Sequence, residues 1–274
     1  MDAIKHKQGA ADNKLFWVFG LSSAIYFIQG IETLPSQSLF YYLKESLKFS
    51  PQKIMVISSL ITFAWLVKPV IGYVIDNFWN KRAWIFISLA LSAVLAAIVG
   101  LNHLPLKFLI GALIISSAWA AFRDVSIDGI MCIEGKKHNA TGKIQSVQWI
   151  SISVATLATG IGGGYIAEKW SYTVAFLCLI PFYIAALAFT YLYKTKEPMR
   201  SETTSKFIRD MKTLLRNKKL LMAGLFCLSL QLFSVIRHAA FFHTKRCVQM
   251  GQGLDRNLEL PGHCFCHHRR FALF

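Results

Sequence analysis

Seven stretches without a charged residue constrain the fold of this chain more than any other feature of its sequence. A helix needs about 20 mostly apolar residues to cross the hydrocarbon core of a bilayer. Three of the stretches are short: two stop at the single charges Glu32 and Lys68, the third stops at Arg123, and apolar sequence resumes after each. The pattern therefore predicts six transmembrane helices and a seventh. The stretches cover residues 15–31, 54–67, 83–101, 108–122, 144–167, 170–193 and 220–236.

Composition excludes the main alternative classes. Charged residues make up 16% of the chain, against about 25% in a typical soluble protein, which is too few to cover a water-facing surface. A disordered chain would need low hydrophobicity and high charge. A soluble helical bundle would show polar stripes at helical spacing, and the apolar stretches show none. We therefore expect an all-α integral membrane protein whose main partner is the lipid bilayer.

The basic residues are distributed unevenly along the chain, whose formal net charge is +16. Seventeen Lys and Arg residues fall in segments 1–14, 76–82, 132–143 and 194–219, and only five fall in the loops of the opposite side. The positive-inside rule then places the N-terminus in the cytoplasm. No basic module with interleaved aromatic residues is present, so nucleic acid is not an expected partner. The short loops suggest a bacterial inner membrane.

The pattern divides the chain into four parts. Residues 1–193 form a six-helix bundle, 194–219 a basic cytoplasmic linker, 220–242 the seventh helix and 243–274 a tail of different composition. Within the linker, residues 205–215 suit either an amphipathic helix on the membrane surface or a solvated connector.

The tail holds four of the eight histidines and three of the six cysteines. Its adjacent candidate ligands at 263–268 lack the loop of two to four residues that separates zinc ligands. No metal site or cofactor is therefore expected, and the favoured interpretation is out-of-frame translation or a truncation scar.

Five charged residues within the predicted spans are the main functional candidates, because charges in lipid are costly and usually face one another or a water-filled pathway. Asp124 and Asp128 share a helix face, whereas Arg123 points about 100° away, toward a neighbouring helix. The five sum to one negative charge, which a single proton would neutralise, so the cluster suits proton coupling. A structural ion-pair lock at Asp124 and Asp128 is the alternative. The five are Glu32, Lys68, Arg123, Asp124 and Asp128.

Three further features bear on the pathway and on packing. Lys68 precedes Pro69, which interrupts the helical hydrogen bonds and can open a helix toward a cavity. Gln145 could donate hydrogen bonds into the pathway. Gly160 and Gly164 form a GxxxG pair, which favours close helix packing.

Residues 72–82, between the second and third predicted spans, resemble the loop signature of the major facilitator superfamily. The match consists of Gly72, Asp76 four residues later, and the basic pair Lys81 and Arg82. The resemblance implies a gating latch of Asp76 and the two basic residues at the inner face, made and broken as two halves rock.

Additional motifs resemble the folate–biopterin transporter family over roughly residues 15–197. The resemblance implies ion-coupled secondary transport of pterins or folates by alternating access. The family has about twelve spans in two six-helix halves with the substrate between them, so this chain corresponds to the N-terminal half, as a truncated product or as one of two assembling copies. The motifs are Gln29–Ile31, Phe40–Glu45, Lys68–Pro69 with Gly72, Arg123–Val125, Asp128–Gly129 and Gly142–Ser146.

The chemistry of such substrates is compatible with the charged candidates. A pterin ring carries an N–H and an amino group side by side, which a carboxylate accepts in bidentate fashion, and Glu32 or Asp124 would serve. Lys68 and Arg123 are candidate partners of the folate carboxylates.

Two other functions stay open, a non-transporting six-helix scaffold and a transporter of another small organic solute. An enzyme is not expected, because the sequence shows no nucleophile–base pair, no two-His metal spacing and no phosphate-binding loop.

Overall fold

A computed structural model describes residues 2–193, with side chains from residue 15 onward, and five single helical positions, 209, 216, 218, 222 and 229. The chain divides into two compact units, residues 1–203 and 204–274, and the elements below belong to the first. Apart from those five positions, the predicted linker, seventh helix and tail lie outside the described residues.

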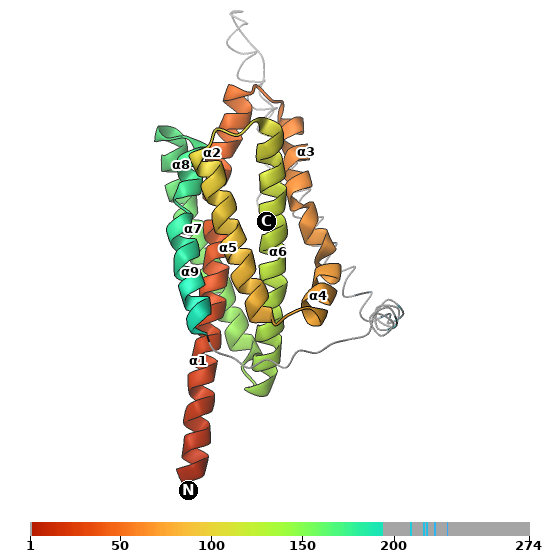
Figure 1. The fold of residues 1–274 in the computed structure, drawn as a ribbon, viewed down its shortest axis with the longest axis vertical. Coiled ribbons are helices and arrows are strands. Elements are labelled where there is room, and N and C mark those ends of the chain that lie inside the picture. Colours follow the sequence, from red (N-terminus) through yellow and green to blue (C-terminus); the bar gives the residue numbers. More distant parts are fainter. Residues whose placement is uncertain are drawn as a thin grey trace, which may run out of the picture. The chain divides into compact units, whose positions relative to one another are not determined.

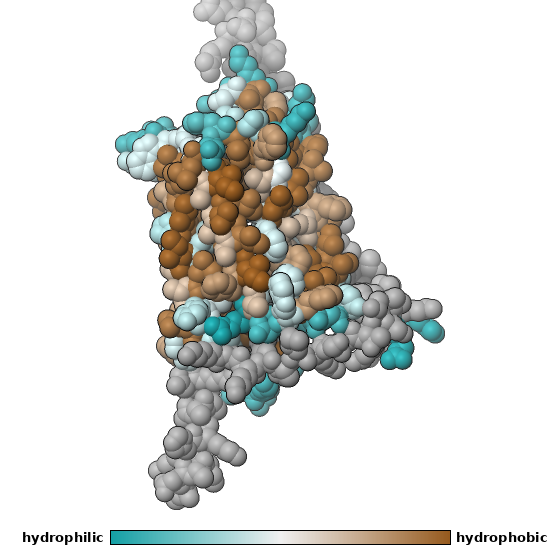
Figure 2. Space-filling model, in the orientation of Figure 1, coloured by the Kyte–Doolittle hydropathy of each residue, from teal (hydrophilic) through white to brown (hydrophobic). Residues whose placement is uncertain are grey.

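Six helical segments are long and apolar enough to cross a membrane, which confirms the six predicted spans. No strand occurs among the described residues. Figure 2 shows a hydrophobic band between two hydrophilic ends, as expected of a bundle that lipid surrounds. The spans are Leu15–Ser46, Pro51–Asn77, Lys81–Leu101, Leu106–Lys137, Thr141–Lys169 and Tyr172–Leu192.

Three spans are continuous and three are broken (Figure 1). The continuous ones are α5 (Lys81–Leu101), α6 (Leu106–Lys137) and α7 (Thr141–Lys169). The broken spans consist of α1 (Asp2–Ile31), α2 (Pro35–Tyr41) and a π turn (Tyr42–Ser46); α3 (Pro51–Thr62), a 3-10 turn (Phe63–Val67) and α4 (Lys68–Asn77); and α8 (Tyr172–Leu177) and α9 (Ile180–Leu192).

A proline lies in the first turn of each segment that follows a break within a span: Pro35 in α2, Pro69 in α4 and Pro181 in α9. Proline lacks an amide hydrogen, and its ring collides with the carbonyl four residues earlier, so a regular helix cannot continue through it. The sequence placed Glu32 within the first helix. The structure instead places Glu32 in the turn after α1, since Pro35 forces α1 to end at Ile31.

The most extensive helix packing in the unit joins α1 to α7. Small residues occupy every fourth position of α7 from residue 151 to residue 163, and the two that carry hydroxyl groups form hydrogen bonds across the interface. Ser151 shares a hydrogen bond of 2.8 Å with Ser23, and Thr159 shares one of 2.8 Å with Thr33. A Cβ atom added to Gly30 would lie 2.5 Å from the Cβ of Ala155. The repeat on α7 is Ser151, Ala155, Thr159 and Gly163.

The predicted GxxxG pair, Gly160 and Gly164, does not belong to this repeat of small residues on α7. A Cβ atom on Gly160 would meet nothing within 4 Å, whereas one on Gly163 would lie 3.0 Å from the carbonyl oxygen of Leu34. On Gly164 it would lie 3.3 Å from Oε1 of Gln37. Among the described residues, the pair therefore packs closely at Gly164 and not at Gly160, because α1 and α2 approach the neighbouring face of α7.

We predict that Gly30→Ala destabilises the unit while Gly160→Ala does not. The new methyl group at residue 30 overlaps Ala155 and the carbonyl oxygen of Ile152, which would lie 2.8 Å away. Overpacking of this kind costs about 1–3 kcal/mol, whereas alanine is the better helix former by about 1 kcal/mol at an open position. Thermal unfolding of both purified variants in detergent measures the difference, and equal melting temperatures would contradict the packing.

Candidate functional site

A buried ion pair lies at the centre of the unit and involves three elements. Arg123, on α6, has a side chain that is 1% exposed, and its Nη2 donates to Oε2 of Glu32 over 2.6 Å. The hydroxyl of Tyr183, on α9, donates to the other carboxylate oxygen over 2.6 Å. Both oxygens of Glu32 therefore accept one hydrogen bond from the protein, and Arg123 faces a neighbouring element as its helical angle predicted.

A second ion pair joins α4 to α6. Nζ of Lys68 lies 2.6 Å from Oδ2 of Asp124. It also lies 4.3 Å from the ring centre of Trp65, in the 3-10 turn, which is within the range of a cation–π contact. The indole N–H of Trp65 donates to the hydroxyl of Ser117 on α6 over 3.2 Å. The helix break before Pro69 thus places the ammonium group of Lys68 and the ring of Trp65 side by side against α6.

Asp128 differs from the other two carboxylates. The hydroxyl of Tyr26, on α1, donates to its Oδ1 over 2.5 Å. Within the described part of the chain, no Lys or Arg nitrogen lies within 4 Å of this carboxylate. The five predicted charges therefore form two neutral pairs, and the negative charge in excess lies on Asp128.

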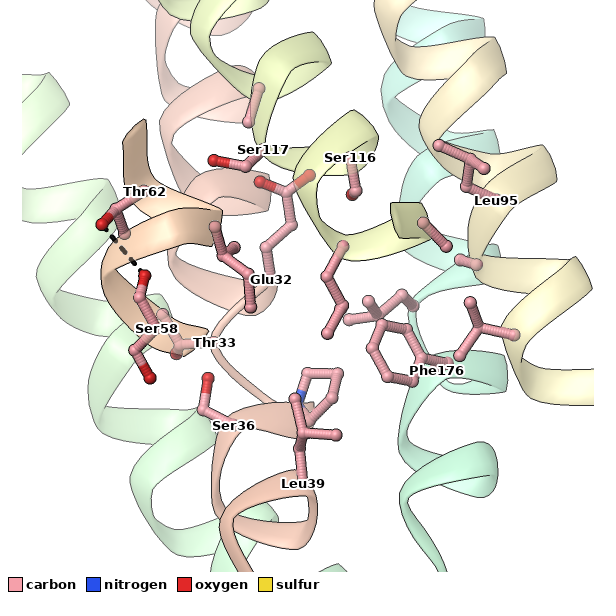
Figure 3. Close-up of a pocket in the computed structure, with 18 of the residues that line it drawn as sticks. Glu32, Thr33, Ser36, Leu39, Ser58, Thr62, Leu95, Ser116, Ser117 and Phe176 are labelled. Atoms are coloured by element: carbon pink, nitrogen blue, oxygen red, sulfur yellow. Dashed lines mark hydrogen bonds between the residues drawn. The ribbon is translucent and has the colours of Figure 1, made fainter. Parts of the chain in front are cut away.

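A cavity of about 410 Å³ opens beside the Glu32–Arg123 pair. Glu32 lines it, together with Tyr183, and neither Lys68, Arg123, Asp124 nor Asp128 does. Figure 3 shows the Glu32 carboxylate near Ser116 and Ser117, with Ser58 and Thr62 on one side of it and Leu95 and Phe176 on the other. The hydroxyl residues are Thr33, Ser36, Ser58, Thr62, Ser116 and Ser117, and the apolar ones include Phe40, Trp65, Leu95, Val99, Leu113, Phe176 and Leu179.

Two other candidates lie elsewhere in the unit. Gln145 is exposed near the start of α7 and is not among the residues that line the cavity. Gly72 has ordinary space around it, since an added Cβ atom would lie 3.7 Å from Val125.

The predicted latch residues flank the turn between α4 and α5: Asp76 lies in the last turn of α4, and Lys81 and Arg82 begin α5. Nζ of Lys81 lies 3.1 Å from Oδ1 of Asp76. Arg82 binds a different element, because it donates to the carbonyl oxygens of Thr190 over 3.0 Å and Tyr191 over 2.6 Å. These carbonyls belong to the last turn of α9, where a basic side chain satisfies free acceptors and complements the helix dipole. Of the two basic residues, only Lys81 is paired with Asp76.

Sequence reasoning overlooked two residues of the site, Tyr26 and Tyr183. Both lie in apolar spans and are almost fully buried. A buried tyrosine hydroxyl usually finds a hydrogen-bond partner, so a tyrosine in the middle of a span was a usable signal. Both hydroxyls donate to carboxylates that the sequence analysis had selected.

A family profile and individual relatives both match this chain, and they point to the same protein family. The sequence profile of the BT1 family matches residues 29–250. "Probable folate-biopterin transporter 4" of Arabidopsis thaliana is 27% identical over 183 residues, covering 64% of this chain and 37% of that protein. The "Folate-biopterin transporter" of Synechocystis sp. is 22% identical over 232 residues, covering 81% and 47%. The chain thus spans less than half the length of these relatives. Their names agree with the expectation that this protein is not an enzyme.

We predict that Arg123→Leu strongly destabilises the unit and that adding Glu32→Gln restores part of the loss. Removing one partner of a buried pair leaves an uncompensated charge and costs about 3–5 kcal/mol. The second change removes that charge while keeping an acceptor for Tyr183. Denaturation of the single and double variants measures the coupling. Strictly additive losses would contradict a direct pair.

Proposed function

Because the chain belongs to the BT1 family, we propose that it is one half of a secondary transporter that moves pterins or folates across a membrane. Six helices of membrane-spanning length make it an integral membrane protein. The names of the relatives support the substrate class. The observation that carries the proposal is the cavity beside Glu32, because it joins a single carboxylate to hydroxyl and apolar walls. The second wall of the pathway comes from another half, either in a longer chain or in a second copy.

Glu32 is the residue that recognises the ring. Each carboxylate oxygen has two lone pairs, and Arg123 and Tyr183 use one on each oxygen. The remaining acceptor capacity suits the adjacent N–H and amino groups of a pterin, which a carboxylate binds in bidentate fashion. Asp124 was the other candidate, but it pairs with Lys68 and does not line the cavity.

The broken spans supply the moving parts of alternating access. The turn at 32–34 and the 3-10 turn Phe63–Val67 both contribute cavity-lining residues. Irregular backbone at membrane depth is tolerated where it lines a cavity, and transporters place their binding sites there. The Asp76–Lys81 pair, at the end of the second broken span, serves as the latch.

Proton coupling is assigned to Asp128. Of the five predicted charges, it is the one without a cationic partner in ion-pair range among the described residues, and Tyr26 joins it to α1. A proton arriving there changes the charge of the cluster without breaking either ion pair. In the orientation we propose, the N-terminus lies in the cytoplasm of a bacterial cell and the cavity lies toward the outer side.

Uptake of radiolabelled biopterin and folate tests the transport proposal. The chain is expressed in cells that lack endogenous uptake, by itself and with its gene continued in the alternative reading frame after residue 236. We expect uptake by at least one version, and a loss of roughly tenfold or more in Glu32→Gln, because charge-assisted hydrogen bonds contribute about 1.5–3 kcal/mol. The matched control is Glu45→Gln, since Glu45 is exposed outside the cavity. No uptake by either version at equal membrane levels would favour a scaffold or another solute.

A second prediction concerns Asp128→Asn. The amide keeps an acceptor for Tyr26 but cannot take up a proton. We therefore expect accumulation driven by a pH gradient to fall to the level without a gradient, while substrate exchange across the membrane persists. Proteoliposomes with an imposed pH gradient measure both rates. Gradient-driven accumulation at the wild-type level would exclude Asp128 as the proton site.

A further inference from the structure

One aromatic ring of the cavity wall is both accessible and held in place. Four aromatic side chains line the cavity, and two of them are buried, since Phe176 is 8% exposed and Tyr183 is 2% exposed. Phe40 is accessible, but its ring lies 6.0 Å from an exposed tyrosine and 6.0 Å from an exposed lysine of its own span. The fourth side chain, Trp65, is half-buried and makes closer polar contacts.

Two contacts hold Trp65 in position before any ligand arrives. The ammonium group of Lys68 lies over the indole ring at 4.3 Å and is itself paired with Asp124 over 2.6 Å. The indole N–H donates to the hydroxyl of Ser117 over 3.2 Å. Lys68 does not line the cavity, so the cavity meets the indole on the surface that Lys68 leaves free. A side chain that is fixed in advance loses little conformational entropy when a ligand binds.

Trp65 also lies close to the candidate recognition group. Its N–H edge is hydrogen-bonded to Ser117, and Figure 3 shows the same Ser117 near the Glu32 carboxylate. Both Glu32 and Trp65 line the cavity. A flat ligand whose edge binds Glu32 can therefore place its face against the indole of Trp65, as aromatic rings prefer in offset stacking.

We infer that Trp65 is the stacking residue of this cavity and makes it select fully oxidised, flat pterins over their tetrahydro forms. This inference rests on the proposed function and assigns the residue that determines specificity within the same site. An oxidised pterin consists of two fused flat rings, whereas a tetrahydropterin has a puckered, saturated second ring. Both forms present the same N–H and amino groups to Glu32. The indole stacks on both rings of the oxidised form and on one ring of the reduced form. Lys68 and Ser117 act as positioning residues for Trp65.

The two oxidation states of one ligand provide the test. The chain is purified into nanodiscs, and biopterin and tetrahydrobiopterin compete with tritiated biopterin in oxygen-free buffer that contains a thiol reductant. We expect biopterin to bind roughly fivefold or more tightly, because aromatic stacking contributes a factor of this order. Trp65→Leu should bring the two affinities to within about twofold of each other. A general loss of the site would weaken both ligands and leave their ratio unchanged.

The matched control is Trp149→Leu, which removes a tryptophan that is 61% exposed on α7 and lies outside the cavity; it should preserve the wild-type ratio. Equal affinities in the wild-type chain, or an unchanged ratio in Trp65→Leu, would overturn the inference and leave the proposed function standing. If neither ligand binds the wild-type chain, both are overturned.

A double-mutant cycle separates the positioning of Trp65 from direct contact between Ser117 and the ligand. Trp65→Phe keeps a flat ring but has no N–H to donate to Ser117. Ser117→Ala should therefore weaken biopterin binding about threefold in the wild-type chain, the effect of one hydrogen bond, and cause no further loss in Trp65→Phe. An equal loss in both backgrounds would show that Ser117 binds the ligand itself and would overturn its positioning role.

Discussion

The ion pair between Arg123 and Glu32 is the interaction on which the central part of the unit depends. An unpaired guanidinium at this depth would be strongly unfavourable, and Arg123 is almost completely enclosed. The pair ties α6 to the turn after α1, and Tyr183 adds α9 through the other carboxylate oxygen. The same contacts hold Glu32 at the edge of the cavity with acceptor capacity left over. A single interaction thus stabilises the bundle and prepares its candidate recognition group.

The breaks in the spans place the polar groups where they can act. Pro35 ends α1 one residue before Glu32, and Pro69 follows Lys68 at the start of α4. Glu32 is therefore the first residue after the end of α1, and Lys68 is the first residue of α4. The 3-10 turn before Lys68 also brings Trp65 against the cavity and beneath the ammonium group. The helix breaks and these two charged residues, both of which are energetically unfavourable inside a membrane, thus lie at the same positions. This is expected where irregular backbone lines a pathway.

Much of the fold could be predicted from the sequence, because apolar stretches of sufficient length leave few alternatives in a bilayer. The helical angle between Arg123 and Asp124 predicted that Arg123 points toward a neighbouring helix, and its partner Glu32 lies in the turn after α1. The side-chain partners of the charged residues were harder to predict from the sequence, since the partners of Glu32 lie 91 and 151 residues away from it. Of the GxxxG pair, only Gly164 packs closely in this unit, and the small residues at every fourth position from Ser151 to Gly163, which face α1 and α2, were not considered. This comparison of sequence and structure concerns residues 2–193 and the five single positions described beyond them.

Protection of an introduced cysteine tests most directly that ligands bind in the cavity beside Glu32. Ser116→Cys places a thiol on the cavity wall, in a background where the native cysteines are replaced by serine. Labelling with a water-soluble thiol reagent is measured on the detergent-purified protein with and without biopterin, and Ser146→Cys, on α7 outside the cavity, reports general effects on accessibility. The account predicts that biopterin slows labelling at residue 116 and leaves residue 146 unchanged. Equal labelling rates at residue 116, under conditions where biopterin binds the protein, would place the ligand elsewhere and contradict the account.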